Sequence, residues 1–141
     1  MTSVLVTGTN VGIGFGIVEQ LAKRPDVEHI FATVRNPSSP ASAEINNLAK
    51  TSSKIHVIPL VLTEESAAAA AKEVSRIAGS LDILINNIGI GQTPQHPAEA
   101  SAVLFREEFE VNVIGPQIIT VAMLPLLKKG NKKVIVNMYL C

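Results

Sequence analysis

The sequence predicts an α/β protein built on a doubly wound parallel sheet of about five strands. Short apolar runs rich in β-branched residues alternate with longer segments of helical periodicity. The apolar runs are continuous rather than alternating, which is typical of parallel strands covered on both faces. With 141 residues, 47% of them hydrophobic, the chain can bury a sizeable core, and we expect residues 1–141 to form a single domain.

Each expected element has a local justification in the sequence. The strands are expected over 3–7, 29–34, 54–60, 82–86 and 133–137, and the helices over 13–23, 41–51, 64–78 and 99–127. The first helix stops at Arg24-Pro25-Asp26, and Thr63 is placed to cap the third. Gly115-Pro116 predicts a bend that divides the last helix into two pieces.

Composition and charge exclude several classes of partner. The 12 basic and 12 acidic residues give a net charge of zero, so we expect no nucleic-acid partner. A single cysteine, Cys141, fits a reducing compartment. The longest apolar stretch, 118–127, is too short to span a bilayer, and the N-terminus reads as a strand, so we expect a soluble cytoplasmic protein with no membrane partner. No cluster of residues has metal-ligand spacing.

A glycine-rich loop, TGTNVGIG at 7–14, joins the first strand to the first helix. Gly8 permits a tight turn, Gly12 permits close approach of a ligand, and Gly14 lets the helix pack near the sheet. The N–H groups that open the helix suit a pyrophosphate. The cofactor-binding candidates in this loop are Gly8, Asn10, Gly12, Ile13 and Gly14. The alternative is a tight structural turn without a ligand.

With three further segments, this loop resembles the short-chain dehydrogenase/reductase family. The other segments are Asn86-Asn87-Ile88-Gly89, Asn112-Val113-Ile114-Gly115-Pro116 and VIVN at 134–137. The stretch 24–40 is most similar to fungal ketoreductases of the norsolorinic-acid type. The resemblance implies a Rossmann-like fold and a nicotinamide cofactor, and it adds Asn87, Ile88 and Gly89 to the cofactor-binding candidates.

Arg35 also joins these candidates. It follows the second strand, where no acid stands, and resembles the NADPH-preferring pattern. The alternative is a solvated loop charge.

The sequence departs from the family pattern where the chemistry is expected. Leu140 stands at the position of the family's serine, and the Tyr-x-x-x-Lys motif would lie beyond residue 141, so the chain is C-terminally truncated relative to the family. Only Asn112 of the four catalytic residues is present. Val61 replaces an aspartate that the family usually has near the adenine, and Ile88 replaces an alanine.

These departures favour an enzyme other than a standard NADPH-dependent reductase. Our leading hypothesis is a cofactor-free cyclisation, isomerisation or pericyclic step on a polyketide-like small molecule in secondary metabolism, with Asn112 and Tyr139 as catalytic candidates. Alternatively, Asn112 satisfies backbone groups at a helix irregularity and Tyr139 packs against the protein.

Two other functions remain open. One is an NADPH-dependent ketoreductase whose missing part is supplied by a partner or lost in a fragment, and the other is a non-catalytic metabolite-binding or regulatory protein. We also expect a homodimer through the helix 99–127.

Overall fold

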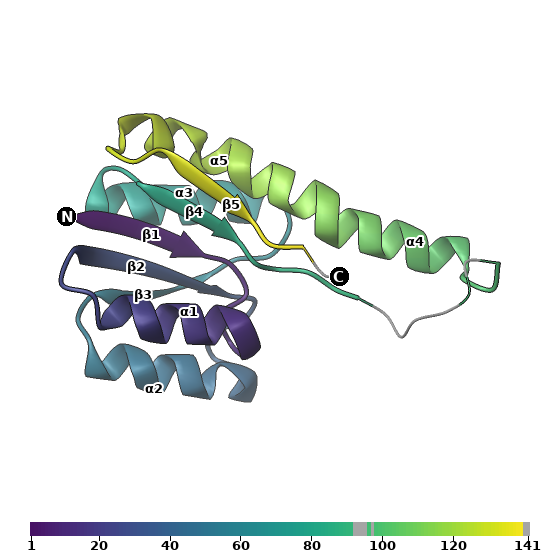
Figure 1. The fold of residues 1–141 in the computed structure, drawn as a ribbon, viewed down its shortest axis with the longest axis horizontal. Coiled ribbons are helices and arrows are strands. Elements are labelled where there is room, and N and C mark those ends of the chain that lie inside the picture. The colour runs from purple at the N-terminus through teal and green to yellow at the C-terminus, as the bar shows by residue number, and fades with distance from the viewer. Residues whose placement is uncertain (92–95, 97, 140–141) are drawn as a thin grey trace.

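The computed structural model describes residues 1–91, 96 and 98–139. Its five strands form a parallel sheet in the order β3-β2-β1-β4-β5, as Figure 1 shows. The strands are β1 (Thr2–Val6), β2 (Val27–Val34), β3 (Ile55–Pro59), β4 (Ile83–Asn86) and β5 (Val134–Asn137). The chain leaves β1 in one direction across the sheet and later returns to its other side, so β1 marks a topological switch point. The predicted fold class is confirmed.

Helices cover both faces of the sheet. Helices α1 (Gly12–Ala22) and α2 (Ala43–Thr51), the latter preceded by the short 3-10 turn η1 (Pro40–Ser42), lie on one face. The other face is covered by α3 (Glu64–Ala78) and by the long helix formed by α4 (Ala102–Phe109), η2 (Glu110–Ile114) and α5 (Gly115–Lys129). Alternate residues of β1 enter two separate cores: Leu5 packs in one, and Val4 and Val6 in the other. Burial on both faces explains the continuous apolar strands.

The expected boundaries hold best where a cap defines them. The Thr63 hydroxyl accepts a hydrogen bond from the Ser66 N–H at 3.2 Å, and α3 begins at Glu64 as predicted. At the other end of α3, Gly79 adopts the left-handed conformation with φ of 73°.

The long helix differs from its expected bounds of 99–127. It begins at Ala102, because the Ser101 hydroxyl caps it by accepting from the Leu104 N–H at 3.3 Å. It continues to Lys129 without breaking into two pieces. The irregularity is a π turn, Glu110–Ile114, immediately before the expected bend. Pro116 has no N–H to donate to the Asn112 carbonyl, and the wider turn accommodates this missing bond.

The same helix is longer than the apolar run from which the membrane expectation was drawn. Ala102–Lys129 contains 28 residues and reaches a mean hydropathy of 1.5, so by length and composition it could cross a membrane. The apolar run 118–127 underestimated its length because the turns on either side also belong to the helix. The core helix of a globular domain passes the same test. Here Ile119, Met123 and Leu127 pack into the hydrophobic core with α3 and the sheet.

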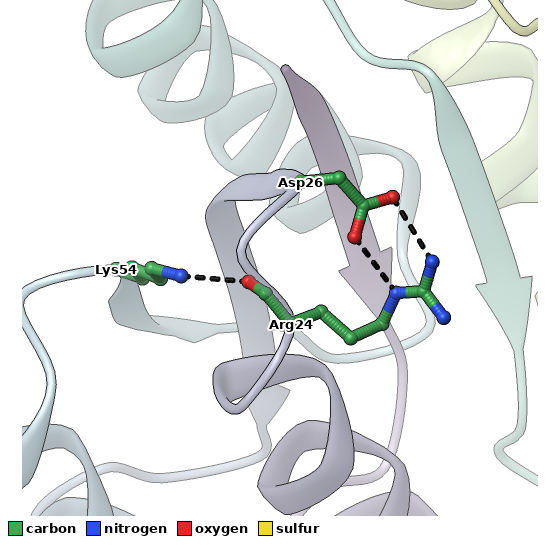
Figure 2. Close-up of polar contacts among 3 residues, drawn as sticks. All are labelled: Arg24, Asp26 and Lys54. Carbon is green, nitrogen blue, oxygen red and sulfur yellow. Dashed lines mark hydrogen bonds and ion pairs between the residues drawn. The ribbon is translucent and has the colours of Figure 1, made fainter.

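Polar contacts gather at the amino ends of the strands, whereas the site described below lies at their carboxyl ends. Figure 2 shows Arg24 donating from its guanidinium to both carboxylate oxygens of Asp26 at 3.0 Å. Lys54, just before β3, donates to the Arg24 carbonyl at 2.8 Å. Asp82, just before β4, is buried and accepts from Ser3 in β1.

Candidate functional site

A cleft of about 820 Å³ lies at the carboxyl ends of four strands. Each strand is followed by cleft-lining residues: Gly8, Asn10 and Val11 after β1; Thr33 to Asn36 at β2; Leu60 to Leu62 after β3; and Asn87 to Ile90 after β4. The long helix adds Glu107 and Val111 to the opposite wall. The cleft therefore spans the switch point at β1, where doubly wound sheets bind their ligands.

The glycine loop is shaped by two different requirements. Gly8 and Gly12 have φ values of 69° and 62°, a conformation that side-chain-bearing residues rarely adopt. Gly14 is required for space, because a Cβ there would lie 2.1 Å from the Gly8 carbonyl oxygen and 2.6 Å from the Asn87 amide nitrogen. Glycine therefore relieves backbone strain at positions 8 and 12 and a steric clash at position 14.

The first turn of α1 faces outward without a side-chain cap. Val11, its N-cap residue, is extended and makes no capping hydrogen bond. Val11 lines the cleft, and Val11 and Ile13 are 61% and 64% exposed. The backbone N–H groups that open an α-helix have no partner inside the helix and carry a partial positive charge. An anionic group in the cleft could accept from them.

Thr7 and Asn87 fix the glycine loop to the loop after β4. The buried Thr7 hydroxyl accepts from the backbone N–H of Asn87 at 2.9 Å and of Ile88 at 3.0 Å. The Asn87 side chain donates to the carbonyls of Thr7 at 3.0 Å and Gly8 at 3.2 Å. Asn87 therefore positions the loop. Our sequence reasoning missed Thr7, although a threonine at the end of a strand before a glycine loop is a recognisable signal.

Ile88 leaves the cleft open despite its size. A Cβ on Gly8 would lie 3.0 Å from Ile88 Cγ1, so the isoleucine packs against the bare Cα of Gly8. The volume of about 820 Å³ is that of the cleft with this side chain in place. The residues present therefore fit a dinucleotide, and a larger side chain at position 88 does not exclude one.

Arg35 places a positive charge at the end of β2. Its side chain is exposed and lines the cleft together with Asn36, Ser39 and Ser42. The turn behind it is held by the hydroxyls of Ser39 and Ser42, which donate to the Asn36 carbonyl at 3.0 and 2.8 Å. Within the described part of the chain, Arg35 has no recorded ion pair. Its guanidinium is therefore available to an anionic ligand.

The two catalytic candidates line a second, smaller pocket of about 310 Å³ together with Asn86, Thr120 and Asn137. The Asn112 side chain accepts from the Ile90 N–H and donates to the Ile90 carbonyl, both at 2.8 Å. It thus satisfies the backbone of the loop after β4. Tyr139 borders this pocket and is 82% exposed. Because Ile90 lines the larger cleft, Asn112 connects the two sites.

Several residues named from the sequence lie outside the described part of the chain or outside the cleft lining. Leu140, Cys141 and most of the loop 89–97 lie outside the described residues. Among the residues that are described, no group of three or more His, Cys, Asp or Glu side chains could hold a metal ion. Gly12, Ile13 and Gly14 shape the glycine loop and the start of α1, but they are not part of the cleft lining itself.

Comparison with known proteins settles the family. The profile of the short chain dehydrogenase family matches residues 2–139. This chain belongs to the short-chain dehydrogenase family. The short-chain dehydrogenase anuI of Penicillium roqueforti is 37% identical over 139 residues, covering 95% of this chain and 54% of the relative. An uncharacterized oxidoreductase of Schizosaccharomyces pombe, C663.06c, is 34% identical over 132 residues, covering 93% of this chain and 51% of the relative.

Solved structures agree with this assignment. NADPH-bound carbonyl reductase from chicken fatty liver is 37% identical, with a TM-score of 0.86 over 92% of this chain and 52% of that protein. The carbonyl reductase Sniffer of Drosophila melanogaster is 30% identical with the same TM-score, over 92% of this chain and 53% of that protein. The chain thus spans about half the length of these relatives. The fungal relatives agree with the fungal resemblance, while the norsolorinic-acid type stays a prediction.

Proposed function

We propose that this chain is the NADPH-binding half of a short-chain oxidoreductase that acts on a carbonyl group. The observation that carries the proposal is the position of Arg35, whose cationic side chain shares one cleft with the glycine loop and has no ion pair among the described residues. A carboxylate at this position would favour a free ribose hydroxyl, whereas an arginine accommodates a 2′-phosphate. The similar chicken reductase, described as NADPH-bound, supports this choice of cofactor.

Different parts of the cofactor would bind at the ends of different strands. The open first turn of α1 would hold the pyrophosphate, and Arg35 would hold the 2′-phosphate. The segment Asn87 to Ile90 would lie beside the nicotinamide half, on the β4 side of the switch point. Bound NADPH supplies a hydride. Asn112 holds this segment in place through the Ile90 backbone and so acts as a positioning residue.

The proton transfer that completes a carbonyl reduction needs groups beyond those described. We propose that the serine, tyrosine and lysine typical of the family come from sequence beyond residue 141 or from a partner polypeptide, since the relatives are about twice as long. The cofactor-free hypothesis receives no support from the relatives, whose names are those of dehydrogenases, oxidoreductases and reductases.

Calorimetry with NADPH and NADH tests the proposal on the 141-residue chain. We expect NADPH to bind at least tenfold more tightly than NADH. Arg35→Leu should weaken NADPH binding by about ten- to a hundredfold, the value of a charge-assisted hydrogen bond of about 1.5–3 kcal/mol, and should leave NADH unchanged. Arg24→Leu is the matched control, because Arg24 lies just before the amino end of β2 and does not line the cleft. Equal affinity for both cofactors, or no binding of either at millimolar concentration, would refute the proposal.

We also propose that two copies associate through the long helix. Phe105, Phe109 and Val113 follow one another at intervals of four residues and are 55%, 56% and 48% exposed. An apolar stripe of this kind favours self-association. Light scattering should report a dimer for the chain and a monomer for Phe109→Glu, and a monomer for both would refute this arrangement.

A further inference from the structure

The charge of this chain is unevenly distributed along the sequence, although its sum is zero. Glu110 is the last acidic residue, and the segment 111–141 contains four lysines but no arginine, histidine or acid. The four lysines occupy six consecutive positions where α5 ends and β5 begins. All of them are exposed, and we call them the lysine cluster: Lys128, Lys129, Lys132 and Lys133.

The lysine cluster lies at the amino end of the sheet, away from both pockets. Figure 1 shows the turn between α5 and β5 at the same end of the molecule as the start of β1. The hydrogen bond from Arg24 lowers the pKa of Asp26, and the charge of Lys132 adds a smaller effect, so the cluster adjoins the ion pair of Figure 2. None of the four lysines lines the cleft or the smaller pocket.

The backbone that carries the cluster is fixed to the core of the protein. The buried Asp82 accepts from the backbone N–H groups of Asn131 at 2.7 Å and of Lys132 at 3.3 Å. Lys133 has a φ of 56°, and among the described residues it alone combines a side chain with a positive φ. Glycine or asparagine would adopt this conformation with less strain. The turn thus keeps a lysine at a position that does not suit its backbone.

The charges of the cluster are not neutralised within the described part of the chain. The two ion pairs recorded there, Arg24–Asp26 and Glu73–Arg76, involve none of the four lysines. The helix dipole accounts for the two lysines in the last turn of α5, since cations are favoured at a helix C-terminus. It does not account for the two that lie beyond the helix. A fixed surface of four positive charges therefore faces the solvent.

We propose that the lysine cluster is a contact surface for a membrane that carries anionic phospholipids. Lysine is a mobile point charge without the planar fork of arginine, so four lysines suit a diffuse layer of headgroups better than one particular carboxylate. Leu124, one turn before Lys128, and Val134, directly after Lys133, are 39% and 40% exposed and supply the apolar contact of an interfacial surface. The expectation of no membrane partner was drawn from the length of an apolar run, which does not bear on a peripheral contact.

Co-sedimentation of the 141-residue chain with vesicles tests the proposal. We expect binding to phosphatidylcholine vesicles with about 30% phosphatidylserine, none to phosphatidylcholine alone, and loss of binding at about 1 M salt, which screens the charges. Lys132→Gln/Lys133→Gln should weaken binding about 25-fold, because each lysine at an anionic surface contributes about fivefold. Lys50→Gln/Lys72→Gln removes two exposed lysines from α2 and α3 and is the matched control, with a change below about threefold.

Three outcomes would overturn the proposal. They are no binding to the phosphatidylserine vesicles at low salt, equal binding to both kinds of vesicle, and equal losses in the two double variants. Tighter binding to polyglutamate than to the vesicles would also overturn it and would identify an acidic polypeptide as the partner. Circular dichroism checks that each variant is folded, and Lys128→Gln/Lys129→Gln, which leaves the turn unchanged, repeats the test if the first variant unfolds. NADPH affinity is a separate measurement, so the proposed function can fail without this inference, and the reverse.

Discussion

Replacing Asp82 with asparagine should cost the protein a large part of its stability. The buried carboxylate accepts four hydrogen bonds: Oδ2 from the Ser3 N–H at 2.9 Å and its hydroxyl at 3.2 Å, and Oδ1 from the N–H groups of Asn131 at 2.7 Å and Lys132 at 3.3 Å. It thereby joins β1, β4 and the turn before β5. Asparagine turns one oxygen into a donor, so two donors lose their acceptor. The expected loss is about 3 kcal/mol, since each unsatisfied buried group costs about 1–3 kcal/mol.

The pH dependence provides a second signature of the same group. Burial raises the pKa of Asp82, but the backbone N–H groups of Ser3, Asn131 and Lys132 together outweigh it, so the pKa lies below its usual value. A carboxyl with a lowered folded-state pKa contributes stability that is complete above about pH 4, the pKa in the unfolded chain. That contribution is lost as the pH falls through the folded-state pKa. The difference between the protein and Asp82→Asn should therefore shrink below about pH 4.

Urea denaturation followed by circular dichroism, at several pH values, measures both effects. At neutral pH a loss of about 3 kcal/mol corresponds to a fall of about 10 °C in the melting temperature of a domain this size. Asp26→Asn is the matched control, because Asp26 also accepts two hydrogen bonds but lies exposed on the surface, where ion pairs contribute little (Figure 2). Equal losses for the two variants, or a loss at Asp82 that does not change with pH, would refute the reasoning.

Three further substitutions probe the site and the sheet. Gly14→Ala should abolish NADPH binding and lower the melting temperature, because its Cβ would collide with the Gly8 carbonyl, whereas Gly16→Ala, which meets nothing within 4 Å, should bind NADPH normally in calorimetry. Asn112→Ala should destabilise the chain by about 1–3 kcal/mol in urea denaturation through its two lost hydrogen bonds, and NADPH binding should weaken as Ile90 loosens. Burial and His29 lower the pKa of His56, so stability should fall as the pH drops below about 6.5, and His56→Gln should flatten that part of the stability profile; an unchanged profile would contradict this.

The sequence predicts the fold well because strand, crossover and cap signals are local. The continuous apolar strands, the cap at Thr63 and the glycine loop each depend on neighbouring residues, and all three are found in the structure. The long helix is the main departure. Its start depends on the Ser101 hydroxyl, and its π turn depends on a proline that removes a donor without ending the helix. Neither effect can be weighed from periodicity alone.

The site was less predictable because it depends on contacts between distant segments. Thr7 acts through the backbone of residues 80 and 81 positions away, so its place before the glycine loop marks it as a candidate but does not identify its partners. For Ile88, by contrast, the sequence overestimated a steric effect. Its added volume suggested a blocked cofactor site, but the space it occupies is the one that Gly8 leaves empty. The effect of a larger side chain at position 88 depends on the residue against which it packs, which here is Gly8 after the neighbouring strand.

The separation of the two pockets changes what the missing catalytic residues imply. The larger cleft, which we propose binds the nucleotide, is lined from the ends of β1 to β4 and has no lining residue from β5. The pocket that holds Asn112 and Tyr139 instead borders β5, an edge strand of this sheet. Groups for proton transfer would complete the second pocket without altering the first. The absence of a Tyr-x-x-x-Lys motif within these 141 residues therefore bears on catalysis and not on cofactor binding. Nucleotide affinity, not turnover, is the property by which this chain should first be judged.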